Sequence, residues 1–152
     1  SLGSGTLTIL QGGESELYNT DDSSTHVNNA SLCTMFEAGS FRYLSTGDAE
    51  AQAEQRLVDR YGKTLHATLF KAGHHGSSTS STDALLQVVQ PQAAAISCGL
   101  NNDYGHPHAR ALQRLTAAGA DIYRTDTMGT ITFTYQNDTL TAAATDTLDA
   151  AA

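Results

Sequence analysis

The side chains best suited to chemistry in this chain are two adjacent histidines, His74 and His75, at the end of an apolar segment. Imidazole binds transition metals and changes its protonation near neutral pH. After one glycine the chain continues with small hydroxyl residues, namely Ser77, Ser78, Thr79 and Ser80. Hydroxyls and exposed backbone amides bind phosphate, and this segment leads into a predicted helix N-terminus. The run therefore predicts a site for metal and phosphate.

Two further segments place a polar side chain at the end of a predicted strand. Asp48 follows one strand and opens a helix, so its carboxylate suits either a helix N-cap or a metal ion. His106 lies at a predicted N-cap, where the helix dipole lowers the pKa of an imidazole. A neutral His106 would accept a proton or contact substrate. An ordinary surface histidine is the alternative interpretation of His106.

The other histidines are expected to lie at the solvated surface. They are His26 in a polar loop, His66 before a strand, and His108 in the first turn of a helix. Asp126 and Gly129 suit a turn. We therefore assign no chemistry to these residues from the sequence.

The candidate ligands are too few for a complete metal centre. Zinc or manganese takes about four or more ligands per ion, whereas the chain offers Asp48, one of the paired histidines and His106. It contains no His-x-His-x-Asp-His run. Residue chemistry alone therefore predicts half of a metal-dependent hydrolase site.

Alternating strands and helices are expected to position these residues. The predicted strands are 6–10, 32–37, 41–45, 67–72 and 93–97. The predicted helices are 49–61, 82–90 and 107–118, the last with Pro107 as its first residue. A last pair of strands is expected between 121–124 and 130–135. This alternation is typical of a layered α/β domain.

Composition limits the possible classes of function. The 152 residues suffice for one domain with its own core, and no apolar run approaches the roughly 20 residues of a membrane-spanning helix. The formal net charge of -8 argues against a DNA-binding surface built from Lys and Arg alone. Bound metal ions can still hold a phosphodiester on an acidic protein. Cys33 and Cys98 are predicted to be free, buried thiols, with one disulfide as the alternative.

Several short motifs occur together along the chain. They are residues 28–32 (Asn-Asn-Ala-Ser-Leu), 45–48 (Ser-Thr-Gly-Asp), 71–77 (Lys-Ala-Gly-His-His-Gly-Ser), 97–99 (Ser-Cys-Gly), 102–107 (Asn-Asp-Tyr-Gly-His-Pro) and 123–125 (Tyr-Arg-Thr). With these motifs in this order, the chain resembles the C-terminal metallo-β-lactamase-like domain of the ComEC competence proteins, the membrane channels of natural DNA uptake. The resemblance runs from about residue 6 to 136. It implies an α/β fold, half or part of an αββα sandwich, with a mixed sheet and flanking helices.

The resemblance also implies metal ligands. Asp48 matches the bridging aspartate of a two-metal site, and His74, preferred over His75, matches a late histidine ligand. Asn29, or its neighbour Asn28, lies where the superfamily places another histidine. Zinc or manganese is the metal expected in the full domain.

The substrate roles implied by the resemblance fall to the remaining motif residues. Ser77 and Ser78 would hold a nonbridging phosphate oxygen, His75 would act in catalysis, and His106 would donate a hydrogen bond to the leaving oxygen. The substrate would be single-stranded DNA, the strand that is not imported. The alternatives are a non-catalytic structural or DNA-guiding domain of the transporter and a hydrolase of small phosphodiesters.

The chain departs from the family pattern because it lacks the His-x-His-x-Asp-His motif of the first half of the domain. Residues 1–136 are therefore expected to be the second half, excised from a larger protein, and 137–152 a disordered tail. Such a half-domain should bind metal poorly and expose a strand edge, which favours self-association or pairing with the rest of the parent protein. The resemblance implies a soluble domain of a bacterial inner-membrane protein.

Overall fold

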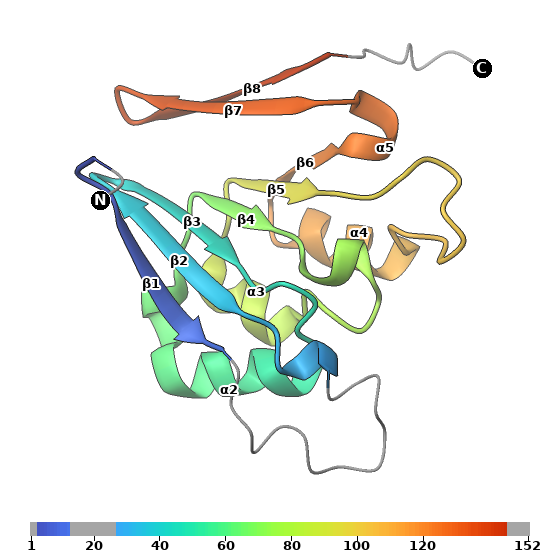
Figure 1. Cartoon of the computed structure of the whole chain (residues 1–152), viewed down its shortest axis with the longest axis horizontal. Coiled ribbons are helices and arrows are strands. Elements are labelled where there is room, and N and C mark those ends of the chain that lie inside the picture. Colours follow the sequence, from blue (N-terminus) through green and yellow to red (C-terminus); the bar gives the residue numbers. More distant parts are fainter. Residues whose placement is uncertain (1–2, 13–26, 146–152) are drawn as a thin grey trace.

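A six-stranded sheet forms the centre of the structure, a computed structural model that describes residues 3–12 and 27–145 (Figure 1). Its strands lie in chain order and are β1 (Thr6–Gln11), β2 (Cys33–Ala38), β3 (Phe41–Ser45), β4 (Leu69–Lys71), β5 (Ala93–Ile96) and β6 (Asp121–Arg124). The first three strands pair antiparallel, and β3 to β6 pair parallel. The prediction of an α/β fold with a mixed sheet and flanking helices is confirmed.

Three helices cross over between the parallel strands and cover one face of the sheet. They are α2 (Ala51–Tyr61), α3 (Asp83–Val89) and α4 (Ala109–Ala117). Leu44 and Phe70 are register partners on β3 and β4, and both are fully buried. They belong to one apolar core together with Leu57 of α2, Leu85 of α3 and Leu115 of α4. Burial of these side chains fixes which face of the sheet the helices cover.

The opposite face of the sheet carries a hairpin of β7 (Ile131–Gln136) and β8 (Thr139–Ala144) (Figure 1). The ring of Tyr135 lies 5.0 Å from that of Phe41 on β3. Similarly, the ring of Phe133 lies 5.2 Å from that of Tyr123 on β6. Because side chains alternate along a strand, Phe41 projects away from the face that Leu44 turns to the helices. The described residues therefore form a helix layer, a sheet and a second, two-stranded layer.

Two predictions for the C-terminal part are wrong. Residues 121–124 do not pair with 130–135, because α4 crosses over and brings β6 parallel to β5. β7 pairs instead with β8, which lies inside the segment predicted to be a disordered tail from residue 137. Asn137 and Asp138 both have positive φ, 51° and 59°, which is the conformation of a two-residue hairpin turn. Residues 146–152, His26 and most of its loop lie outside the described residues.

One edge of the sheet is formed by β1, where Leu7 is 54% exposed and Ile9 is 64% exposed. An apolar edge strand is a template for pairing with another chain, and the self-association expected from the sequence stays a prediction. In the part of the chain that the structure describes, no helix is both long and apolar enough to cross a membrane.

The parallel strands β3, β4 and β5 end at the same edge of the sheet. The loops that leave this edge carry Asp48 after β3, the paired histidines after β4, and His106 after β5. Ligand sites of α/β proteins form at this edge because the loops converge there. The topology therefore gathers side chains that are far apart in the sequence.

Candidate functional site

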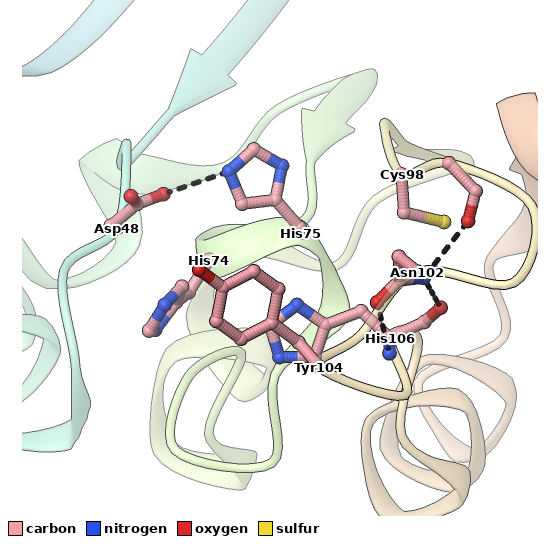
Figure 2. Close-up of a pocket in the computed structure, with 8 residues that line it drawn as sticks. Asp48, His74, His75, Cys98, Asn102, Tyr104 and His106 are labelled. Carbon is pink, nitrogen blue, oxygen red and sulfur yellow. Dashed lines mark hydrogen bonds and ion pairs between the residues drawn. The ribbon is translucent and has the colours of Figure 1, made fainter.

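A pocket of about 360 Å³ opens where these loops converge (Figure 2). Its lining residues are Asp48, His74, His75, Cys98, Gly99, Asn102, Tyr104 and His106. The structure thus brings together four residues that the sequence predicts for the site, and it adds Cys98, Gly99, Asn102 and Tyr104. These residues lie in two motifs of the family resemblance, 97–99 and 102–107, but the sequence assigned them no role because neither motif distinguishes a pocket wall from an ordinary loop.

The paired histidines lie in a tight turn, the 3-10 segment Gly73–Gly76. Both have left-handed backbone conformations, with φ of 47° at His74 and 54° at His75. The amide of His74 donates to the carbonyl of Gly47 at 2.9 Å, which ties the turn to the loop of Asp48. Non-glycine residues in this conformation are strained and gather at functional sites.

His75 is the histidine that lies beside Asp48. Its Nε2 is 3.6 Å from Asp48 Oδ1 (Figure 2). Its Nδ1 is 2.7 Å from the carbonyl oxygen of Ser97. A carbonyl only accepts, so Nδ1 carries the hydrogen and Nε2 of the neutral ring keeps its lone pair on the side of Asp48. Metal-binding histidines are held in this way by a carbonyl behind the ring. His74, which we expected to be the ligand, instead has its Nδ1 3.7 Å from Glu50 Oε1.

Asp48 does not serve as an N-cap. The N-cap of α2 is Glu50, whereas the backbone amide of Asp48 is bonded to Ser31 Oγ at 3.0 Å. Its side chain is 43% exposed and faces the pocket. The carboxylate is therefore free to take a ligand.

The pair of donor atoms fits a divalent metal ion. Zinc lies about 2.0–2.2 Å from imidazole nitrogen or carboxylate oxygen, so atoms 3.6 Å apart on His75 and Asp48 can reach one ion. Within residues 3–12 and 27–145, however, no group of three or more His, Cys, Asp or Glu side chains is arranged to hold a metal. Asp48 and His75 could therefore form only part of a coordination sphere.

His106 is held rigidly in the loop after β5. Asn102 receives the amide hydrogen of His106 at 3.0 Å and donates to its carbonyl at 2.6 Å. Burial, followed by the neighbouring imidazoles of His108, His74 and His75, lowers the pKa of His106. The sequence predicted a lowered pKa for His106, but it named a helix dipole as the cause. That cause is wrong, because α4 begins at Ala109 and its N-cap is His108.

The hydroxyls and amides predicted to bind phosphate are already hydrogen-bonded to other groups of the chain. Ser77 is 4% exposed, with its hydroxyl 3.0 Å from that of Thr79, and the amide of Ser78 donates to Nδ1 of His108 at 2.9 Å. The amides of Ser81 and Thr82 donate to the side chain of Glu54. Neither Ser77 nor Ser78 lines the pocket, so their assignment to substrate phosphate has no geometric support. His108, expected to be solvated, is part of this internal network.

A buried carboxylate, Glu54 of α2, takes the place expected for phosphate. It is fully buried and receives the amides of Ser81 and Thr82 at 2.6 and 2.8 Å. Sequence reasoning missed it, although its place on the apolar stripe beside Ala53 and three residues before Leu57 was a usable signal. Glu54 anchors the loop that follows the paired histidines.

Asn29 does not reach the pocket. It is 1% exposed and its Oδ1 accepts from the amide of Glu50 at 3.0 Å, so its oxygen is engaged in structure. Its neighbour Asn28 donates to Glu50 Oε1 at 3.0 Å. Cys33 and Cys98 are both free thiols, as predicted, but only Cys33 is buried, since Cys98 is partly exposed. Burial raises the pKa of Cys33 to about 12.

Comparison with known proteins places the chain close to bacterial competence proteins. It is 40% identical over 110 residues to ComE operon protein 3 of Bacillus subtilis, 38% over 119 residues to Competence protein ComA of Neisseria gonorrhoeae, and 33% over 117 residues to Recombination protein 2 of Haemophilus influenzae. These matches cover 72%, 78% and 76% of this chain, and 14%, 16% and 14% of the relatives. No family model matches the chain, and no solved structure matches it significantly. The homologues support a competence or DNA-uptake family, of whose proteins this chain spans a small part.

Proposed function

We propose that this chain forms one wall of the active site of a metal-dependent nuclease or phosphodiesterase within a competence protein. The observation that carries the proposal is the approach of His75 Nε2 to Asp48 Oδ1, 3.6 Å apart in an open pocket at the carboxyl ends of parallel strands. The layered order of helices, sheet and hairpin supports a metallo-β-lactamase-like half-domain, whose other half would complete an αββα sandwich.

In this proposal Asp48 and His75 hold a divalent ion, zinc or manganese. When bound, such an ion would polarise a phosphodiester and lower the pKa of water. Ser97 orients His75 through its carbonyl, which accepts from Nδ1 and leaves Nε2 of the neutral tautomer as the nitrogen that binds a metal. Because two side chains do not complete a coordination sphere, the remaining ligands come from outside the described residues, and the isolated chain binds metal weakly.

His106 contacts the substrate rather than the metal. Its lowered pKa keeps the imidazole neutral near pH 7, so one ring nitrogen carries a hydrogen and the other accepts. The bonds with Asn102 hold the loop in place. A neutral, positioned imidazole can donate a hydrogen bond to the oxygen that leaves phosphorus. His74, with its ring centroid 5.5 Å from that of His106, lines the same wall.

Single-stranded DNA is the proposed substrate, and the rest of a parent competence protein is the proposed partner. The names of the homologues support this choice over a small phosphodiester. The chain would then act in a domain outside the membrane, joined to a membrane channel.

The test compares the chain alone with the chain joined to the sequence that precedes it in its gene. Each is incubated with end-labelled single-stranded DNA and Mn²⁺ or Zn²⁺. We expect cleavage by the longer protein, loss of at least about 100-fold in rate for Asp48→Asn, and little change for Asp59→Asn, the same substitution at an exposed site on α2. Full cleavage by Asp48→Asn would refute the site. Absence of cleavage by the longer protein with either ion would favour a non-catalytic domain.

A further inference from the structure

Tyr104 is an aromatic side chain in the pocket wall that the proposed chemistry does not use. It is 78% exposed and stands beside His106 at the tip of the loop after β5 (Figure 2). Leu100, in the same loop, is 65% exposed but does not line the pocket. Exposed single apolar residues are common, so exposure alone does not assign a role to Tyr104.

The backbone around Tyr104 is held in place. Its carbonyl oxygen lies 3.1 Å from Nε2 of His108, and the amide of Gly105 donates to the carbonyl of Asn102 at 3.1 Å. The side chain of Asn102 also bonds both backbone groups of His106. The phenol therefore projects into solvent from an ordered loop, which lowers the entropy lost when a ligand binds to it.

Three rings of the pocket are nearly parallel. The ring planes of Tyr104 and His106 differ by 21° with centroids 5.7 Å apart, and those of His106 and His75 differ by 16° with centroids 6.4 Å apart. The series begins at His75, beside Asp48, and ends at the exposed phenol. A flat ring that stacks on Tyr104 would thus continue an aromatic series that leads to the reactive end of the pocket.

The charges of the pocket favour stacking over ion pairing as the means of holding a nucleic acid. None of the residues that line the pocket is Lys or Arg, and Asp48 adds a negative charge. Unpaired bases expose their faces, and proteins bind them by stacking on aromatic side chains with little dependence on sequence. Paired bases in a duplex do not offer these faces.

We propose that Tyr104, backed by His106, is a stacking platform for a base of single-stranded nucleic acid. The platform makes the pocket select nucleic acid over simple phosphodiesters, and it admits single strands of any sequence. This inference rests on the proposed function for its substrate class, but it concerns binding and is tested without catalysis.

The experiment measures binding of fluorescently labelled oligodeoxynucleotides to the 152-residue chain by anisotropy, in EDTA so that no cleavage occurs. We expect Tyr104→Ala to weaken binding of both oligo-dT and oligo-dA by about 5- to 150-fold, the range that stacking of one base contributes. Tyr104→Phe should keep the affinity, since it retains the ring. Leu100→Ala is the matched control in the same loop and should bind as the unmodified chain does.

An abasic oligonucleotide of equal length distinguishes stacking from damage to the loop. Tyr104→Ala should leave its weaker binding unchanged, because no base is present to stack. An equal loss for normal and abasic strands, an unchanged affinity for normal strands, or no binding of single strands by the unmodified chain would each overturn the proposal. A base-dependent loss together with inactivity of the longer protein in the nuclease assay would retain the platform and reject the nuclease.

Discussion

Replacement of Glu54 should loosen the loop that carries the paired histidines. This carboxylate is fully buried between α2 and the start of α3, and it receives the amides of Ser81 and Thr82 at 2.6 and 2.8 Å. The hydroxyl of Ser81 in turn accepts from the amide of Gly73 at 3.2 Å, at the first residue of the histidine turn. Glu54 thus connects helix α2 to the segment that presents His74 and His75.

The magnitude follows from the donors left without partners. Glu54→Ala removes both acceptors, and a buried amide without a partner costs about 1–3 kcal/mol, so we expect a loss of about 2–6 kcal/mol in the free energy of unfolding. Glu54→Gln keeps the volume and one acceptor oxygen, so it should lose less. Asp59→Ala, on the exposed face of the same helix, should stay within about 0.5 kcal/mol.

Stability should also depend on pH through Glu54. Burial raises the pKa of Glu54 more than the bonds from Thr82 and Ser81 and the charge of Arg114 lower it. A raised pKa means that the folded chain binds more protons than the unfolded chain, so stability falls as pH rises from the ordinary value of 4.5 through the raised one. This slope should be absent from Glu54→Gln and Glu54→Ala.

Urea unfolding followed by far-ultraviolet circular dichroism, repeated between pH 4.5 and 8, measures both effects. If the free energy of unfolding depends on urea concentration equally steeply in each variant (equal m), the folded and unfolded states remain comparable. If Glu54→Ala unfolds at the same urea concentration as the unmodified chain, then Glu54 does not anchor the loop through the amides expected to bind phosphate.

Two further predictions concern Gly76 and the cysteines. An added Cβ at Gly76 (φ 83°) would lie 2.6 Å from Cβ of Pro107, whereas Gly119 (φ 81°) has nothing within 4 Å of an added Cβ. In urea unfolding, Gly76→Ala should therefore lower the free energy of unfolding by about 1–3 kcal/mol more than Gly119→Ala. Equal losses would show that the contact with Pro107 is unimportant. In native chain at pH 8.5, iodoacetamide should label the partly exposed Cys98 and spare Cys33, because burial holds the Cys33 pKa near 12 and keeps its thiol neutral. Mass spectrometry should find both labelled in urea, and rapid labelling of native Cys33 would contradict its burial.

The helices and most strands of the central sheet were predictable because their signals are local. Ala53 and Leu57 repeat at helical spacing, and α2 buries both. The helix predicted over 82–90 begins after Thr82, a residue type that favours N-caps, and the Thr82 hydroxyl accepts from the amide of Leu85 at 3.3 Å. The hairpin β7–β8 was missed because the second strand ends in three alanines, a residue type depleted in strands, and carries Leu140 as its one large apolar side chain. Its partner and the turn at Asn137 and Asp138 decide its structure.

In the candidate site, too, some features were predictable from local sequence and others depend on tertiary contacts. The residue types around His74, His75, Asp48 and His106 indicated metal and phosphate chemistry from the sequence, since few side chains bind metals and histidine is the commonest. The sequence could not say that His75 rather than His74 faces Asp48. That choice depends on two left-handed residues in one turn and on the carbonyl of Ser97.

By itself, the sequence determined the chemical character of the site and the alternation of elements that carries it, because both depend on residue type and short spacing. Only the tertiary structure decided which groups meet. Glu54 accepts an amide that was expected to bind phosphate, and Asn29 bonds the backbone of Glu50 instead of reaching the pocket. Tyr104 is the outer ring of an aromatic series. These outcomes depend on contacts between loops that the parallel strands bring to one edge, and such contacts leave no local pattern in the sequence.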